Sequence, residues 1–239
     1  MVDALKASLI CAAALACASP VRAEAPPQPQ SSAQLPSSTQ PPVWPDTFVA
    51  RVEALATLES LNADLLSHDS ATLTLERWCD AHRLASPARV VAQPESLDKA
   101  PSADQRRELG IGPAEAVRYR RVRLICGSTL LSEADNWYVP SRLTAEMNER
   151  LTRSDVPFGK VVQALHFQRR TLSSTLLWRP LPEGWDMAQA TGGDGTRTLV
   201  MPHAVLEHRA LLTLPDGTPI SEVVETYTNG VLAFPPPRP

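Results

Sequence analysis

The chain has 239 residues, of which 43% are hydrophobic, 21% charged and 5% aromatic, so it can form a packed core and extensive disorder is not expected. Its formal net charge is −3 and its isoelectric point is near 6.0. This argues against a nucleic-acid-binding protein, because such proteins normally carry a basic excess. The sequence lacks an apolar run of about eighteen residues, so no helix is expected to span a bilayer.

The first 23 residues have the pattern of a secretory signal peptide. Lys6 supplies a positive charge, an apolar stretch covers residues 7–18, and Val21 and Ala23 are small residues at the −3 and −1 positions of a cleavage site. The alternative is an amphipathic N-terminal helix of a cytosolic protein. We therefore expect a periplasmic or secreted protein with a signal peptide over 1–23.

Proline-rich segments flank the rest of the chain. Residues 24–45 contain seven prolines among Gln, Ser and Ala, and residues 235–239 contain four. Neither segment has apolar periodicity, so we expect a solvated linker and a solvated tail. The globular domain is therefore predicted over residues 46–234.

Helical patterns dominate the first half of this domain. Helices are predicted over 47–66, 71–82, 103–109 and 142–151. Ser70 and Ser102 precede two of them as N-cap residues.

Strand patterns dominate the second half. Strands are predicted over 89–92, 116–126, 130–139, 164–178, 197–201, 205–214 and 219–228. Residues 127–129 and the Asp216-Gly217 pair mark hairpin turns, and the Gly-rich segment 191–196 is interpreted as a flexible turn. Helices followed by hairpin-linked strands predict an α+β fold with a mostly antiparallel sheet.

Cys79 and Cys126 are the only cysteines outside the predicted signal peptide. In an exported protein they could form a disulfide, and two separate buried thiols are the alternative. The five histidines are scattered, and no metal-binding or cofactor fingerprint occurs. No metal or cofactor is therefore expected.

Four arginines fall within residues 118–123. In a strand, Arg121 and Arg123 share one face, while Arg118 and Arg120 share the other. An arginine on a buried face needs an anionic partner, because burying an unpaired charge is costly. That partner could be a protein carboxylate or a ligand carboxylate held by two hydrogen bonds.

Glu222 and Glu225 lie among apolar residues in the last predicted strand. A glutamate on a pocket face could donate a proton to a ligand, whereas on the opposite face it would be solvated. Because side chains alternate between faces, at most one of the two faces inward without a bulge.

Several weak motifs occur in an order that resembles a known family. They are Asp69 to Thr72, the Arg121-to-Cys126 spacing, the hairpin 126–140, the corner 156–159, Arg170 beyond it, and the closing segment 214–225. In order and spacing these segments resemble the chorismate pyruvate-lyase family, whose fold is shared by ligand-sensing domains of some bacterial transcription regulators. The resemblance spans about residues 60–230, nearly the whole predicted domain.

The resemblance implies a six-stranded antiparallel sheet with helices packed on one side and a ligand enclosed beneath helices. It implies Arg121 and Glu225 as catalytic residues, with Arg121 holding a substrate carboxylate and Glu225 protonating the enolpyruvyl ether. Taken together with the strand patterns, the predicted ligand-binding residues are Arg121, Arg123, Asp135, Phe158, Arg170 and Glu222.

The sequence departs from the family at several points, one of which is an insertion near residues 183–203 that has no counterpart in the family. Asp135 and Asn136 stand where the enzymes have Gly-Arg, so one basic contact is missing and Asp135 would repel a dicarboxylate. Spacing from Pro219 puts Val224 at the catalytic position, unless a bulge shifts Glu225 there. An exported location also separates the protein from chorismate, which is made and used in the cytoplasm.

Three functional hypotheses follow. We favour an exported domain that binds a small aromatic or carboxylated metabolite without turning it over. The alternative is a carbon–oxygen lyase of the chorismate pyruvate-lyase type, which releases pyruvate to give 4-hydroxybenzoate. A structural or interaction domain without a ligand is the third. None of them involves nucleic acid or an integral membrane segment after signal cleavage.

Overall fold

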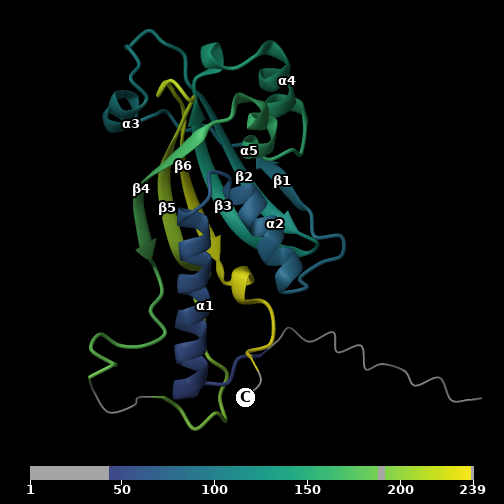
Figure 1. The fold of residues 1–239 in the computed structure, drawn as a ribbon, viewed down its shortest axis with the longest axis vertical. Helices are drawn as coiled ribbons and strands as arrows, with labels where there is room; N and C mark the ends of the chain where they lie inside the picture. Colours follow the sequence, from purple (N-terminus) through teal and green to yellow (C-terminus); the bar gives the residue numbers. More distant parts are fainter. Residues whose placement is uncertain (1–42, 188–191, 238–239) are drawn as a thin grey trace, which may run out of the picture. The chain divides into compact units, whose positions relative to one another are not determined.

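A six-stranded antiparallel sheet organises the structure, a computed structural model that describes residues 43–187 and 192–237. The strands are β1 (Val90–Glu95), β2 (Arg118–Cys126), β3 (Thr129–Tyr138), β4 (Gln168–Leu176), β5 (Ala204–Thr213) and β6 (Pro219–Thr228). Their order across the sheet is β1-β2-β3-β6-β5-β4 (Figure 1). This confirms the predicted α+β fold with a six-stranded antiparallel sheet.

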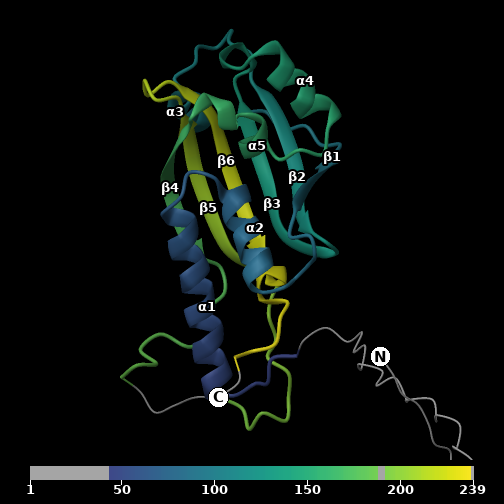
Figure 2. The same cartoon turned by 45° about the vertical axis from the view of Figure 1, so that its right-hand side comes forward.

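Most of the helices cover one face of this sheet. The helices of the described residues are α1 (Phe48–Leu66), α2 (Ala71–Ala81), α3 (Ala103–Glu108), α4 (Ala145–Arg153) and α5 (Phe158–Val161), with short 3-10 turns at Pro140–Arg142 (η1), Gln163–Leu165 (η2) and Asn229–Leu232 (η3). Figures 1 and 2 show α1 and α2 running along the sheet, with α4 and α5 over its far end. Only α3 ends on the other face, where its C-cap Leu109 packs against Trp137 and Leu211.

Local signals in the sequence start most of these helices. The side chains of Ser70 and Ser102 accept hydrogen bonds from backbone N–H groups in the first turns of α2 and α3, which satisfies donors that a helix leaves unpaired at its start. Thr144 caps α4 in the same way. The predicted helix 142–151 therefore begins three residues later than expected, at Ala145.

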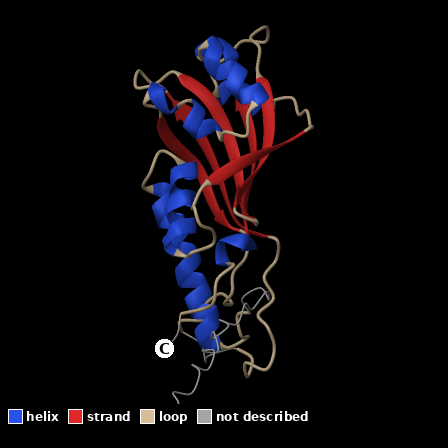
Figure 3. Ribbon diagram, turned by 90° about the vertical axis from the view of Figure 1, so that its right-hand side faces the viewer, coloured by secondary structure: helices blue, strands red, loops and turns tan. Residues whose placement is uncertain are grey.

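One predicted strand does not form. Residues 197–201 make only an isolated β-bridge, between Thr198 and Pro45, because this segment lies against the start of the folded chain and not in the sheet. In Figure 3 the strands form a single twisted layer beside α1.

The main hydrophobic core lies between the sheet and helices α1 and α2. Trp44 belongs to it, with 2% of its surface exposed, and its indole N–H donates to the carbonyl oxygens of Leu232 and Phe234. The folded part therefore includes the last residues of the predicted linker 24–45. The predicted signal peptide 1–23, the linker up to residue 42, residues 188–191 and residues 238–239 lie outside the described residues.

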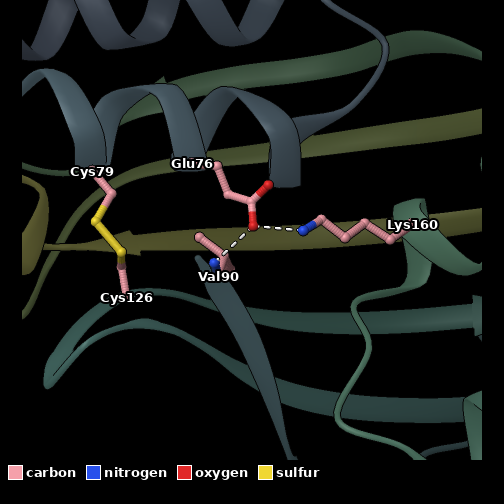
Figure 4. Close-up of a disulfide and its surroundings, with 5 residues drawn as sticks. All are labelled: Glu76, Cys79, Val90, Cys126 and Lys160. Atoms are coloured by element: carbon pink, nitrogen blue, oxygen red, sulfur yellow. Dashed lines mark hydrogen bonds and ion pairs between the residues drawn. A yellow bond between two sulfur atoms is a disulfide. The ribbon is translucent and has the colours of Figure 1, made fainter. Parts of the chain in front are cut away.

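A disulfide joins α2 to the end of β2. Cys79 and Cys126 are bonded to each other and both are fully buried (Figure 4). Of the two alternatives for these cysteines, the structure therefore has the disulfide.

Residues 43–187 and 192–237 contain neither a bilayer-spanning helix nor a cluster of metal ligands. None of the helices there has the length and apolar character needed to cross a bilayer. In the same part of the chain, no three His, Cys, Asp or Glu side chains gather as metal ligands would.

Candidate functional site

A hollow opens between the sheet and the helices, at the place where α5 and the start of α2 cover the sheet. It holds about 500 Å³ of empty space, counting the part that is open to solvent. Its walls come from β2, β3, β5 and β6, from β4 with the residue before it, and from the start of α2 and α5. The lining residues are Asp69, Ser70, Ala71, Thr72, Arg120, Val122, Leu124, Ala134, Asn136, Pro157, Phe158, Gly159, Phe167, Arg169, Leu212, Val223 and Glu225.

Arg120 is the unusual member of this lining. The residue is 8% exposed, and its Nη2 donates only to the backbone carbonyl oxygens of Ser154 and Val156, each at 3.3 Å. Its Nε is buried without a hydrogen-bond partner, and no carboxylate of the described residues lies within 4.0 Å of it. Burial lowers the pKa of this guanidinium from its usual value, which indicates that its charge is poorly compensated by the protein.

A second buried arginine in the hollow has an internal partner. Arg169 donates from Nη2 to Oε2 of Glu225 at 2.6 Å, and the two side chains are 3% and 8% exposed. The hydroxyl of Tyr227 also donates to Oε2 of Glu225, at 3.1 Å. Burial lowers the pKa of Arg169, but the charges of Glu225, Tyr227 and Asp69 and the hydrogen bond to Glu225 together outweigh burial, so the pKa is raised. This pair is therefore close to neutral as a unit.

A bulge in β6 brings Glu225 to the hollow. Leu212 of β5 pairs with Ser221 and the next residue, Thr213, pairs with Pro219, so Ile220 is the extra residue. Beyond the bulge the strand alternates regularly, so Glu225 lies on the same face as Val223 and Leu212, and Glu222 lies on the other face. Spacing from Pro219 alone would put Val224 at this position, and the extra residue Ile220 puts Glu225 there instead.

The remaining polar groups of the hollow are mostly satisfied. Asn136 accepts a hydrogen bond from the hydroxyl of Ser221, and the exposed Asp69 accepts one from the backbone N–H of Arg169. The other walls are largely apolar. The hollow thus combines an apolar lining, a nearly neutral ion pair and one buried arginine that has no acidic partner in the part of the chain that the structure describes.

Arg121, predicted as the key residue of the site, is outside the hollow. Its guanidinium lies on the opposite face of the sheet, with carboxylate oxygens of Glu95 at 2.7 Å, Asp135 at 3.0 Å and Glu133 at 3.2 Å. The hydrogen bonds to Asp135 and Glu95 raise its pKa. Arg121, predicted to hold a ligand in a pocket, is therefore not part of this hollow, because the alternation in β2 turns Arg120 inward and Arg121 outward.

Four other predicted site residues share the outer face or its rim. Arg123 and Asp135 alternate with residues that line the hollow, so they face away from it. Glu222 is fully buried but bonds to Arg209 at 2.7 Å on the opposite face. Arg170 is 60% exposed and pairs with Glu108 of α3.

Two predicted residues, Phe158 and Glu225, are among the lining residues. Sequence reasoning missed Arg120 and Arg169, each one residue before a predicted one. A signal for Arg120 was present, since it alternates with Val122 and Leu124, which are apolar and mark the buried face of the strand.

A buried polar cluster lies beside the hollow. His208 is fully buried in β5, directly across from Glu225 in β6. Its Nε2 lies 2.8 Å from Oδ1 of Asn62 in α1 and 3.1 Å from Oγ of Ser174 in β4. Burial lowers the pKa of His208 to about 4, so the ring is neutral at pH 7 and ties α1 to the sheet.

Comparison with protein families and curated proteins gave one clear match. No protein-family model matches the chain. A protein of Sinorhizobium fredii, described as uncharacterized protein y4mC, is 56% identical over 196 residues, and the match covers 81% of this chain and 83% of that protein.

Solved structures show weaker likeness. PhnF from Mycobacterium smegmatis is 11% identical with a TM-score of 0.44, covering 72% of this chain and 70% of that chain. The C-terminal domain of a histidine utilization repressor from Pseudomonas syringae is 10% identical with a TM-score of 0.37, covering 59% and 92%. Because both TM-scores are below 0.5, the fold is established by the strand order and not by these likenesses.

Proposed function

The chain belongs to the same protein family as y4mC of Sinorhizobium fredii, and we propose that it binds a small, singly anionic molecule in the hollow lined by Arg120. One observation carries this proposal. Arg120 is buried with two long hydrogen bonds to carbonyl oxygens and no acidic partner among the described residues.

Such an arginine is costly for the folded protein unless something neutralises it. A buried charge without a partner loses its hydration and gains little in return. A carboxylate in the hollow would compensate it, since each charge-assisted hydrogen bond contributes about 1.5–3 kcal/mol. The planar guanidinium can offer two parallel N–H donors to one carboxylate.

The rest of the lining supports an apolar body for the ligand. Phe158, Phe167 and Leu212 offer aromatic and aliphatic surface, which favours an aromatic or branched aliphatic group. A second anionic group is not favoured, because Arg169 is already neutralised by Glu225. The proposed ligand class is therefore a small monoanion with an apolar body, such as an aromatic carboxylate.

We also propose that the protein works in an oxidising compartment outside the cytoplasm. The disulfide between Cys79 and Cys126 supports this, because disulfides persist in exported proteins and are rare in the cytosol. The signal-peptide pattern of residues 1–23 agrees with it.

Turnover of chorismate is not part of this proposal. The lyase hypothesis assigned substrate binding to Arg121, which is engaged by three acids on the far face. Glu225, its assigned proton donor, is engaged by Arg169 and Tyr227. Chorismate is instead one probe in the test of binding.

The test measures binding of benzoate, 4-hydroxybenzoate, hexanoate, phenylphosphonate and chorismate by calorimetry, with benzamide as the neutral match to benzoate. We expect at least one anion to bind, benzamide to bind more weakly than benzoate, and Arg120→Gln to weaken binding about tenfold or more. Arg121→Gln is the matched control and should leave the affinity unchanged.

Three results would contradict the proposal. If the Arg120→Gln variant bound anions as tightly as the unaltered chain, Arg120 would not be part of the ligand site. Failure of every anion to bind would favour a structural or interaction domain without a ligand. Formation of 4-hydroxybenzoate from chorismate, followed by absorbance between pH 5 and 8, would establish the lyase instead.

A further inference from the structure

The roof of the hollow is made of two separate pieces of chain. One is the start of α2 with its N-cap Ser70, and the other is α5 with Phe158 and Gly159. The two pieces lie close together: a Cβ atom added to Gly159 would lie only 3.3 Å from Oγ of Ser70. The position of α5 relative to α2 therefore sets the shape of the roof.

One carboxylate outside the hollow ties these pieces together. Oε1 of Glu76 in α2 accepts hydrogen bonds from Nζ of Lys160 in α5 at 2.5 Å and from the backbone N–H of Val90 in β1 at 2.9 Å (Figure 4). Glu76 and Lys160 are 18% and 26% exposed as side chains. Neither residue lines the hollow.

The helix α5 needs such a tie, because it has little stability of its own. It covers only Phe158–Val161, and its N-cap Pro157 makes no side-chain capping bond. Isolated helices of this length do not persist in water. Contacts with neighbouring elements must hold it. Phe158 and Val161 are buried in a hydrophobic cluster, and Lys160 adds the one ion pair of α5 among the described residues.

We propose that Glu76 is a positioning residue for the ligand site: through Lys160 it holds α5, and with it Phe158, over the hollow. The inference rests on the proposed function, because the expected effect of losing the ion pair is a lower ligand affinity. Without the Glu76–Lys160 ion pair, α5 moves more freely over the hollow, and a bound ligand loses part of its apolar wall.

Because of the disulfide, the effect of Glu76 on α5 can be measured in a variant that still folds. Cys79 lies three residues after Glu76 in α2, and its bond to Cys126 holds α2 on the sheet independently (Figure 4). The indole N–H of Trp78 also anchors α2, by donating to the carbonyl oxygen of Val231. Loss of the ion pair should therefore leave α2 in place and release mainly α5.

The experiment compares Glu76→Gln, Lys160→Met and the double variant with the unaltered chain. Glu76→Gln keeps an oxygen that can accept from Val90, so mainly the ion pair is lost. We expect each single variant to weaken binding of the tightest anion of the panel above by about three- to tenfold. The double variant should bind no more weakly than the weaker single variant, because both remove one interaction.

Hydrogen exchange gives a second readout that needs no ligand. The amides of residues 158–162 should exchange several-fold faster in both single variants, while the amides of α2 around Cys79 keep their protection. Glu149→Gln is the matched control, since it breaks the exposed Glu149–Arg153 pair in the neighbouring helix α4. It should change neither affinity nor exchange of residues 158–162.

Three outcomes would overturn the inference. Unchanged exchange of residues 158–162 in both variants would show that the ion pair does not hold α5. A lower melting temperature with unchanged affinity would show a structural tie only. If no anion binds the unaltered chain, the proposed function fails and this inference, which rests on it, fails too. Faster exchange of residues 158–162 would then show only that Glu76 holds α5.

Discussion

Arg120 and Arg121 are adjacent in β2, but their guanidinium groups lie on opposite faces of the sheet and in opposite electrostatic conditions. Arg120 is buried against backbone carbonyl oxygens, and no acidic side chain of residues 43–187 or 192–237 pairs with it. Arg121 contacts three carboxylates and its side chain is 26% exposed. The same residue type thus carries an uncompensated charge on one face and completes an ion network on the other.

This contrast predicts opposite effects of the same substitution. Arg120→Met should raise the free energy of unfolding of the ligand-free protein by about 1 kcal/mol, because a buried uncompensated charge is replaced by an apolar side chain. Arg121→Met should lower it by about 1–2 kcal/mol, because three clustered carboxylates lose their cation. Urea unfolding at pH 7 measures both, and a decrease for Arg120→Met would argue against an uncompensated charge.

His208 predicts a pH dependence of stability. Its folded-state pKa is lowered to about 4, chiefly by burial, whereas an unfolded histidine has a pKa near 6.5. Between these values the unfolded chain binds more protons, so stability is full above about pH 6.5 and falls as the pH drops toward 4. Between pH 7 and pH 5 this histidine should remove about 2 kcal/mol from the free energy of unfolding.

The measurement is urea unfolding at pH 7, 6 and 5 for the unaltered chain and for His208→Gln, which should lose that part of the pH dependence. The exposed His68 provides the control, since His68→Gln should keep it. Equal slopes for the unaltered chain and His208→Gln would show that His208 is not buried in its neutral form.

The disulfide predicts a large loss of stability on removal. Cys79 and Cys126 are separated by 47 residues, and a loop of this size corresponds to about 4 kcal/mol of stabilisation in the chain-entropy model. The Cys79→Ala/Cys126→Ala double variant should lose most of this in urea unfolding. Mass spectrometry of the unreduced protein checks the bond itself, and two free thiols would contradict it.

Gly230 predicts a steric effect at the start of η3. A Cβ atom there would overlap the carbonyl oxygen of Leu130, which is backbone and cannot rotate away. Gly230→Ala should therefore lower the free energy of unfolding by about 1–3 kcal/mol. Gly112 is the control, because a Cβ atom on it meets nothing within 4 Å, and Gly112→Ala should be nearly neutral. Urea unfolding at pH 7 measures both variants.

The fold could be predicted largely from local signals. Ser70 and Ser102 fixed the starts of two helices, and Asp216-Gly217 fixed the final hairpin, because caps and turns act within a few residues. Trp44 could not be placed in the core in this way. Its hydrogen-bond acceptors Leu232 and Phe234 lie 188 and 190 residues further along the chain.

The site was harder to predict, because it depends on the parity of strand positions. A register error of one residue moves every side chain to the other face, and the family resemblance led to Arg121 and Arg170 where the hollow contains Arg120 and Arg169. Glu225 required a bulge at Ile220, which only pairing with the neighbouring strand reveals. The apolar residues that alternate with Arg120 were the better guide.

The contact of Trp44 with Phe234 has a practical consequence for protein engineering. The first and last parts of the folded domain meet at this aromatic pair, whose ring centroids are 6.1 Å apart. Figures 1 and 2 show the start of α1 and the segment after η3 at the end of the sheet away from α4 and α5. A short peptide joining these parts, with new termini opened in the exposed turn at Asp216, would give a circular permutant that keeps every strand pairing. In the chain with its original order, a fusion partner or surface tether attached beside Trp44 would lie at the end of the sheet away from α5. The hollow would then stay accessible to a ligand in a biosensor.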